Sequence, residues 1–385
     1  MKSSLPTIIQ QELDFLAYSV AFNSENVLFV GGGDGVNHSG VKNQLASFTI
    51  DKENKKLVRI DSLLLSEKED CPMSITCHPQ LPLLAAGVNS SKDNSKQENN
   101  LNCKLFQTKD NKITLKQQIL ANQSKATAGY QQKVIRYSKG GNYLVTAFSD
   151  GKVSVLNTKD WTLVFQVLQF KNLQDVDFDS KEEHMAIATS NSLIIISIKE
   201  KGKIIQVIDS PKLNKQTSCE IRAVRYATLN EQETLYAVVN STSKGHGFIC
   251  AWKLLKGQEY PVVKPRTASV SRKNITHFSV SPNGDILAFV SNDFSIHLID
   301  IQTFKPLLKV NQAHGFAITD LVFSHSGEYL ATSGADNQCK VMMLSNINEY
   351  LETSDEYNQV IYGVLDMLLF ALLMHIIVQI VDQGN

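Results

Sequence analysis

The residues best suited to ligand chemistry lie in one short stretch, GGGDGVNHSGVKN, from Gly31 to Asn43. It holds five glycines, and glycine tolerates positive φ, so successive backbone carbonyl oxygens can point at one spot. Asn43 adds a side-chain oxygen, and Asp34 adds a carboxylate that could help to hold a cation. Oxygen ligands of this kind suit a weakly charged cation, and a bare backbone equally suits close approach of a partner's main chain. We call Gly31–Asn43 the glycine segment.

The glycine segment does not fit a nucleotide-phosphate loop. A dinucleotide fingerprint needs a helix directly after the glycines, and a P-loop needs Gly-Lys followed by Ser or Thr. The residues that follow, QLASFTID from Gln44 to Asp51, alternate with period two and predict a strand. The segment is therefore expected to join two strands. An insertion without function stays open, although such loops usually resemble the Lys- and Asn-rich run Ser90–Asn102.

The elements that must position this segment are short repeated strands. VIRYSKGGNYLVTAFSDGKVSVLNTKDWTLVFQV, Val134 to Val167, aligns without a gap with His277 to Val310, and a third copy begins at Asp320 and runs to Leu344. Each copy alternates five- to six-residue apolar runs with tight-turn residues. Repeats of about 40 residues with four strands each are typical of a β-propeller of WD type.

Counting first strands predicts seven blades. They are expected near Tyr18, Ser74, Val134, Leu173, Ile221, Ile275 and Ile318. The seventh blade has three strands before an acidic linker, residues 346–359, and the run Leu5–Leu13 is expected to supply its fourth strand and close the ring. The fold class is thus all-β, a seven-bladed propeller over residues 1–345 with a C-terminal transmembrane helix.

The transmembrane prediction rests on Val360–Val381, 22 residues broken only by Asp366, His375 and Gln379. A helix of this length spans about 33 Å, enough to cross a bilayer. The part after Asp366, Met367 to Val381, is short, which suits a thin membrane such as the endoplasmic reticulum. Residues 382–385 would form a short luminal tail, and the propeller would face the cytosol. An amphipathic or buried helix that packs on the domain is the alternative.

Composition excludes one class of partner. Lys and Arg number 38, as do Asp and Glu, so no surplus of basic residues indicates a nucleic-acid partner. The six cysteines show no spacing typical of zinc ligands or a disulfide framework, and we expect reduced thiols. They are Cys71, Cys77, Cys103, Cys219, Cys250 and Cys339.

These features together resemble the endoplasmic-reticulum guanine-nucleotide exchange factors for the Sar-type small GTPase, the yeast Sec-twelve and mammalian prolactin regulatory element-binding protein family. The resemblance rests on the G-x-x-N ending of the glycine segment (Gly40 to Asn43), the seventh-blade stretch Asn311–Asn337 with its AHGFAIT motif, and the C-terminal span. It implies a factor that promotes GDP release at the endoplasmic reticulum membrane and so initiates COPII vesicle coat assembly and ER-to-Golgi transport. No covalent chemistry is expected.

The resemblance also implies residue roles. The glycine segment would protrude, be organised by a potassium ion held by backbone carbonyls, and insert into the GTPase. The exchange residues would be Asn43, Val41 and Lys42. The partner-binding residues would be Gly31, Gly32, Gly33, Asp34, Gly35, Gly40, His314 and Phe316, and the potassium ligands Gly31, Gly32, Gly33 and Asn43. Asp34 and Lys42 depart from the family's loop in detail.

Three readings remain open beside these roles. His314 can instead be a structural hydrogen-bond partner of Asp336, as is usual in WD repeats. A noncatalytic, tail-anchored WD-repeat scaffold would share the blades and the span. A propeller enzyme would need convergent His, Asp or Glu side chains on the central channel, and the sequence shows no such set.

Overall fold

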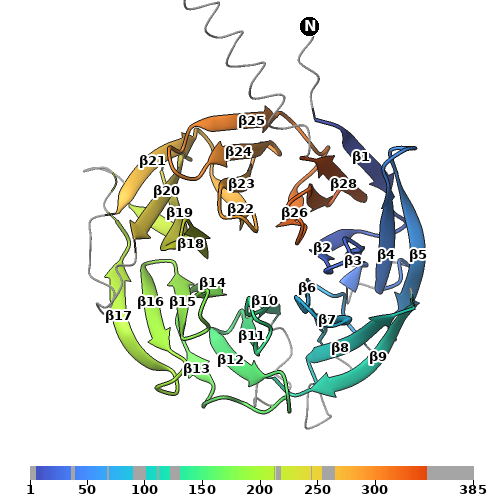
Figure 1. The fold of residues 1–385 in the computed structure, drawn as a ribbon, viewed down its shortest axis with the longest axis horizontal. Coiled ribbons are helices and arrows are strands. Elements are labelled where there is room, and N and C mark those ends of the chain that lie inside the picture. Colours follow the sequence, from blue (N-terminus) through green and yellow to red (C-terminus); the bar gives the residue numbers. More distant parts are fainter. Residues whose placement is uncertain are drawn as a thin grey trace, which may run out of the picture.

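The computed structural model describes residues 6–35, 40–66, 69–89, 101–110, 112–121, 131–211, 213, 218–243, 245–253 and 265–344. These residues form seven four-stranded antiparallel sheets arranged as blades around a ring (Figure 1). The predicted all-β, seven-bladed propeller is confirmed, and each of the seven predicted first strands is present.

The strands of each blade follow one another from the centre of the ring to its rim, as Figure 1 shows. Blade 1 is β2 (Ala17–Phe22), β3 (Leu28–Gly32), β4 (Gln44–Asp51) and β5 (Lys56–Leu64), and blade 2 is β6 (Ser74–Cys77), β7 (Leu83–Gly87), β8 (Cys103–Lys109) and β9 (Lys112–Ile119). Blade 3 is β10 (Gln132–Tyr137), β11 (Tyr143–Phe148), β12 (Lys152–Asn157) and β13 (Leu168–Gln169), and blade 4 is β14 (Leu173–Phe178), β15 (His184–Thr189), β16 (Ser192–Ser197) and β17 (Lys203–Asp209). Blade 5 is β18 (Cys219–Leu229), β19 (Gln232–Ser241), β20 (Gly247–Lys253) and β21 (Arg266–Ser271), and blade 6 is β22 (Ile275–Val280), β23 (Ile286–Ser291), β24 (Ile296–Asp300) and β25 (Pro306–Val310). Blade 7 is β26 (Ile318–Phe323), β27 (Tyr329–Gly334), β28 (Gln338–Met343) and β1 (Ile8–Glu12).

The core lies between the blades. Second strands such as β3, β7 and β27 are buried at every residue, because a neighbouring blade covers each of their faces. Outermost strands such as β9 expose most of their residues and read as polar. A single sheet could not bury both of its faces alone, so the blades are stable only when stacked in a ring.

The N-terminal strand closes this ring, as predicted. β1 pairs with β28 along its whole length, from Ile8 opposite Met342 to Glu12 opposite Gln338. Ile9 is buried in a cluster that contains residues of both ends of the chain, including Val341. The pairing removes an exposed sheet edge.

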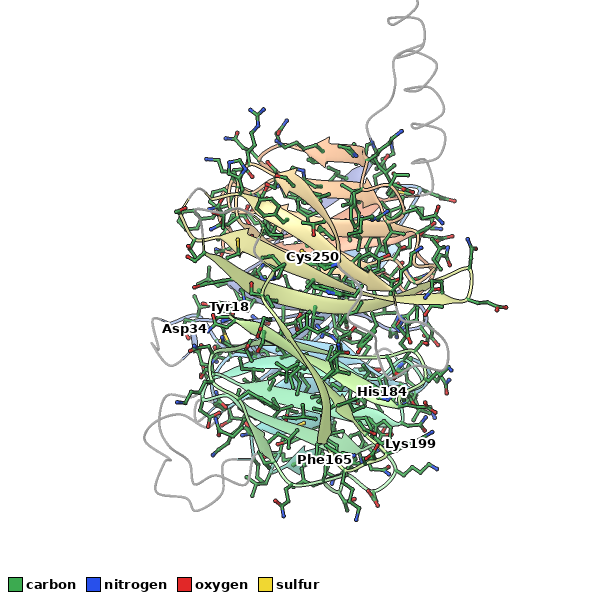
Figure 2. All side chains as sticks on the ribbon, turned by 90° about the vertical axis from the view of Figure 1, so that its left-hand side faces the viewer. Tyr18, Asp34, Phe165, His184, Lys199 and Cys250 are labelled. Atoms are coloured by element: carbon green, nitrogen blue, oxygen red, sulfur yellow. The ribbon has the colours of Figure 1, made fainter. Side chains whose placement is uncertain are left out.

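All innermost strands run in the same direction, because each is the first strand of its blade. The first residue of β2, Ala17, pairs with Gly32 at the end of β3, so the glycine segment leaves β3 on the face of the ring where the innermost strands begin. We call this the glycine face. Figure 2, which views the ring from its edge, places Tyr18 and Asp34 on this face and His184 and Lys199 on the other.

Two further predictions concern cysteines and the membrane. All six cysteines are free, as expected. Within the described ranges, which end at residue 344, no helix is long and apolar enough to cross a bilayer. The predicted acidic linker, transmembrane helix Val360–Val381 and luminal tail lie outside the described residues.

Candidate functional site on the glycine face

The loop within the glycine segment begins later than predicted, after Gly32. Gly31 and Gly32 are not loop residues: they belong to β3, where Gly31 pairs with Ser19 and Leu45, and Gly32 with Ala17 and Gln44. Residues 31–35 are all buried. The expectation that Gly31 and Gly32 protrude toward a partner is therefore wrong for this arrangement.

Close packing explains why these positions are glycine. A Cβ atom at Gly32 would overlap the carbonyl oxygen of Leu16, and one at Gly33 would overlap the Asn43 side chain. Gly33 and Gly35 also have positive φ, +143° and +67°, a region that favours glycine. Some of these glycines are therefore required by close packing and not by loop exposure. Composition alone does not distinguish the two causes.

Asn43 fastens the base of the segment. Its side-chain oxygen Oδ1 accepts the Gly35 N–H at 3.0 Å, and its Nδ2 donates to the carbonyl oxygens of Gly35 at 3.0 Å and Glu69 at 2.9 Å. The side chain is 7% exposed. In this arrangement Asn43 is a positioning residue: it clamps the outgoing arm of the segment to the loop that joins blades 1 and 2.

That neighbouring loop is itself held by buried polar contacts. Glu69 forms an ion pair with Lys104, which is 4% exposed, and burial lowers the pKa of the Lys104 ammonium to about 8. Asp70 accepts the Cys71 N–H at 2.8 Å, and burial raises the pKa of both the Asp70 carboxyl and the Cys71 thiol. The base of the glycine segment therefore rests on a fixed support.

The returning arm of the segment offers the accessible groups. Gly40 is exposed, with φ +106° and no neighbouring atom within 4 Å of an added Cβ. Lys42 is exposed as well, whereas Val41 is half-buried and packs against the core cluster of blades 1 and 7. Residues 36–39 between the two arms lie outside the described residues.

His314 has a structural role. Its Nδ1 lies 3.0 Å from Asp336 Oδ1 and its Nε2 lies 2.8 Å from Thr332 Oγ1. The side chain is buried, and burial lowers the pKa of the imidazole. The predicted His314–Asp336 hydrogen bond is confirmed, and in this arrangement His314 cannot present its ring to a partner.

Phe316, by contrast, is 62% exposed, the most exposed of the large apolar side chains in the described part of the chain. It stacks on Phe294 with ring centroids 6.3 Å apart. Phe316 precedes β26 and Phe294 lies between β23 and β24, so both belong to the glycine face. An exposed aromatic pair on a face with an anchored loop is suited to protein contact.

Three of the four predicted potassium ligands, Gly31, Gly32 and Asn43, have other partners within the protein. Gly31 and Gly32 are held in the β3 ladder. Asn43 Oδ1 already accepts a backbone N–H, and the Asn43 carbonyl accepts the Leu65 N–H at 2.8 Å. In this arrangement these three residues are held by protein contacts.

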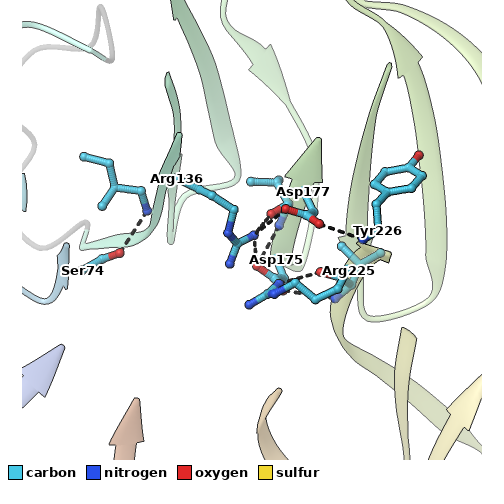
Figure 3. A network of polar contacts seen from close by, with 9 residues as sticks. Ser74, Arg136, Asp175, Asp177, Arg225 and Tyr226 are labelled. Carbon is cyan, nitrogen blue, oxygen red and sulfur yellow. Dashed lines mark hydrogen bonds and ion pairs between the residues drawn. The ribbon is translucent and has the colours of Figure 1, made fainter. Parts of the chain in front are cut away.

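The central channel holds a set of charged residues that sequence reasoning missed. Asp175 contacts Arg136 and Arg225, and Arg136 also approaches Asp177 at 3.6 Å (Figure 3). Arg136, Asp175 and Arg225 come from the innermost strands of three different blades, so no local spacing reveals their contact. The arginines neutralise Asp175 and Asp177, and burial raises the pKa of the Asp177 carboxyl.

Comparison with known proteins agrees with the fold. The family model described as "WD domain, G-beta repeat" matches residues 305–341, which span β25 to most of β28. The chain is 23% identical over 87% of its length to "Putative guanine nucleotide-exchange factor SED4" of Saccharomyces cerevisiae, but covers only 31% of that relative. It is 22% identical over 93% of its length to "Guanine nucleotide-exchange factor SEC12" of Candida glabrata, covering 77% of it.

A plant protein is similar over a comparable range. The chain is 21% identical over 80% of its length to "SEC12-like protein 2" of Arabidopsis thaliana, of which it covers 73%. All three alignments are too long to be confined to one blade. The chain is therefore a relative of the Sec12 and Sed4 guanine nucleotide-exchange factors, built on a WD-type β-propeller.

Proposed function

We propose that this chain is a guanine-nucleotide exchange factor that promotes GDP release from a Sar-type small GTPase. The observation that carries the proposal is its similarity, over 87% and 93% of its length, to relatives named as such factors. The glycine face adds physical support, since it combines an anchored loop with the exposed Phe316.

Exchange needs no covalent step. A factor that binds the nucleotide-free GTPase better than the GDP-bound form lowers the barrier to release by that difference in affinity. A ~10⁴-fold preference corresponds to about 5.5 kcal/mol. The chain must therefore present a surface that is already ordered, so that binding energy is not lost in ordering it. Asn43 would hold that surface in place, and Lys42 and Phe316 would contact the partner.

We further propose that the chain acts at the endoplasmic reticulum membrane, anchored through Val360–Val381 with the propeller in the cytosol, and so initiates COPII coat assembly. The support is the apolar composition of that segment. Membrane fractions extracted with alkaline carbonate should retain the chain. Its release into the supernatant would contradict an integral anchor.

The potassium ion implied by the family resemblance stays a proposal. Three of its four predicted ligands, Gly31, Gly32 and Asn43, have protein partners in this structure, and the exchange mechanism proposed above does not require the ion. Exchange rates measured in potassium and in sodium buffer test it: a gain specific to potassium would support the ion, and equal rates would contradict it.

The test of exchange is release of fluorescent GDP from a purified Sar-type GTPase by the full chain in liposomes. Wild type should accelerate release, and Lys42→Glu should reduce the rate at least about tenfold, the equivalent of about 1.4 kcal/mol. Lys199→Glu is the matched control, because Lys199 is an exposed lysine on the opposite face and should leave the rate unchanged.

Two results would contradict the proposal. No acceleration by a correctly folded wild type would favour a noncatalytic, tail-anchored WD-repeat scaffold. If Lys42→Glu and Lys199→Glu change the rate of GDP release equally, the glycine segment is not part of the contact surface.

A further inference from the structure

Six innermost strands carry a β-bulge at their start, and the extra residue of each bulge lines the central channel. A bulge sets two residues against one and re-aims a side chain away from the regular alternation. The six residues, which we call the bulge ring, are Tyr18, Lys133, Gln174, Arg222, Thr276 and Thr319. They come from six different blades and surround the channel mouth on the glycine face.

The bulge ring has one chemical character. Each of its side chains carries a hydrogen-bond donor at neutral pH, and none is a carboxylate. The channel behind it has a volume of about 530 Å³, enough for a small ligand. A ring that holds two cations, Lys133 and Arg222, and no carboxylate, around a cavity of this size, is complementary to an anion.

The charged side chains along the whole channel also favour an anion. Five cationic side chains line it against two carboxylates. Asp175 is fully engaged by Arg136 and Arg225. Asp320 accepts the backbone N–H groups of Val20 at 3.0 Å and Leu321 at 2.8 Å, and burial raises its pKa. The carboxylates thus act within the wall and do not neutralise the mouth.

The two cations of the bulge ring have only neutral partners. Lys133 Nζ donates to the Leu173 carbonyl oxygen at 3.0 Å, and Arg222 Nη1 donates to Gln174 Oε1 at 3.3 Å. Among the described residues neither forms an ion pair with a carboxylate. They are close enough that the charge of Arg222, added to burial, lowers the pKa of the Lys133 ammonium. An anion between them would relieve this repulsion.

We infer that the bulge ring binds a compact, multivalent phosphate anion at the mouth of the channel. Arg222 would supply the planar fork that matches phosphate oxygens, and Lys133 the point charge. The Tyr18 hydroxyl would add a donor. The hydroxyls of Thr319 and Thr276 and the amide of Gln174 already donate within the protein, to Ala17 O at 2.7 Å, Val290 O at 3.4 Å and Ser190 Oγ at 3.0 Å. This inference does not rest on the proposed exchange activity.

Inorganic pyrophosphate is the probe, titrated into the full chain in detergent at constant ionic strength, with heat of binding as the readout. Wild type should bind saturably with one site. Lys133→Gln and Arg222→Gln should each weaken binding about tenfold, as expected for loss of one charged hydrogen bond. The matched control is Lys203→Gln with Arg59→Gln, which removes one lysine and one arginine from the outermost strands β17 and β5 and should leave the affinity unchanged.

Gln174→Glu keeps the size of the side chain and its contact with Arg222 but places a carboxylate in the ring, so it should abolish binding while the fold persists. Circular dichroism without ligand checks that each variant is folded. Absence of saturable binding by folded wild type would overturn the inference. An equal loss in the Lys203/Arg59 control would do the same, because the binding would then be nonspecific.

Discussion

Asn43 could act by contacting the partner or by holding the glycine segment in place, and its position in the sequence does not distinguish these two roles. A residue that contacts a partner must expose its side chain, but the Asn43 side-chain amide forms three hydrogen bonds within the protein. Its replacement would therefore act first on the protein itself. Any effect on exchange would follow from a displaced glycine segment.

Asn43→Ala should lower the free energy of unfolding by about 1–3 kcal/mol, because the buried N–H of Gly35 and the carbonyls of Gly35 and Glu69 lose their partner. Urea denaturation measures this change. Asn54→Ala is the control, since Asn54 is an exposed turn residue bonded only to Asp51, and it should have little effect.

Amide hydrogen exchange then distinguishes positioning from contact. Faster exchange over residues 31–35 in Asn43→Ala would agree with a clamp that has been released. If stability and amide exchange match wild type while GDP release falls, Asn43 touches the partner directly and the clamp is not its main role.

The candidate site could be predicted only in part. The sequence correctly predicted the His314–Asp336 pair, because WD repeats reuse that hydrogen bond, and the role of the glycine segment stays a prediction. The sequence could not show that Gly32 and Gly33 are required by packing against Leu16 and Asn43. Glycine is needed both where a backbone is exposed and where atoms crowd it, so residue type alone leaves the two causes unresolved.

At the scale of elements, β1 decides whether the ring is closed. Its two neighbouring isoleucines face opposite ways: Ile9 is 1% exposed and Ile8 is 39% exposed. Ile9→Ala should lower the free energy of unfolding by about 2–5 kcal/mol, because it leaves a cavity between the two ends of the chain. Ile8→Ala should have a much smaller effect, and guanidinium denaturation compares the two.

Equal losses from these two variants would contradict the register in which Ile9 lies opposite Val341. A one-residue shift would exchange the buried and exposed faces of the strand. Such a result would also remove β1 as the specific closing strand.

The strands themselves were readily predicted, for a physical reason. Each blade repeats the same alternation and the same turns, so the first strand near Ile318 could be found by comparison with that near Ile275. The C-terminal end of β3 was misplaced, because glycine is a poor strand former and marks turns more often. Only the pairing of Gly31 and Gly32 with strands on both sides shows that they belong to the sheet.

The whole molecule brings together residues that no local pattern connects. The bulge ring requires the pairing register of six blades, and bulges cannot be read from residue types alone. The ion network in the channel likewise joins Arg136 of blade 3, Asp175 of blade 4 and Arg225 of blade 5. These contacts form only after the ring has closed, so their loss should affect the stability of the assembled propeller.

Asp175→Asn should therefore destabilise the whole ring. The change removes the carboxylate that Arg136 and Arg225 share and leaves Arg136 with Asp177 at 3.6 Å. Removing one member of a buried ion pair lowers stability by about 3–5 kcal/mol. Asp160→Asn removes the same charge from an exposed turn and should leave the unfolding midpoint unchanged. Because the network links three blades, the loss should appear as a lower midpoint of one cooperative transition, measured by both circular dichroism and tryptophan fluorescence. Tryptophan fluorescence reports Trp161 of blade 3 and Trp252 of blade 5. A variant that unfolds in two steps, with this fluorescence separating from the circular dichroism, would instead show that the blades are stable independently of the channel contacts.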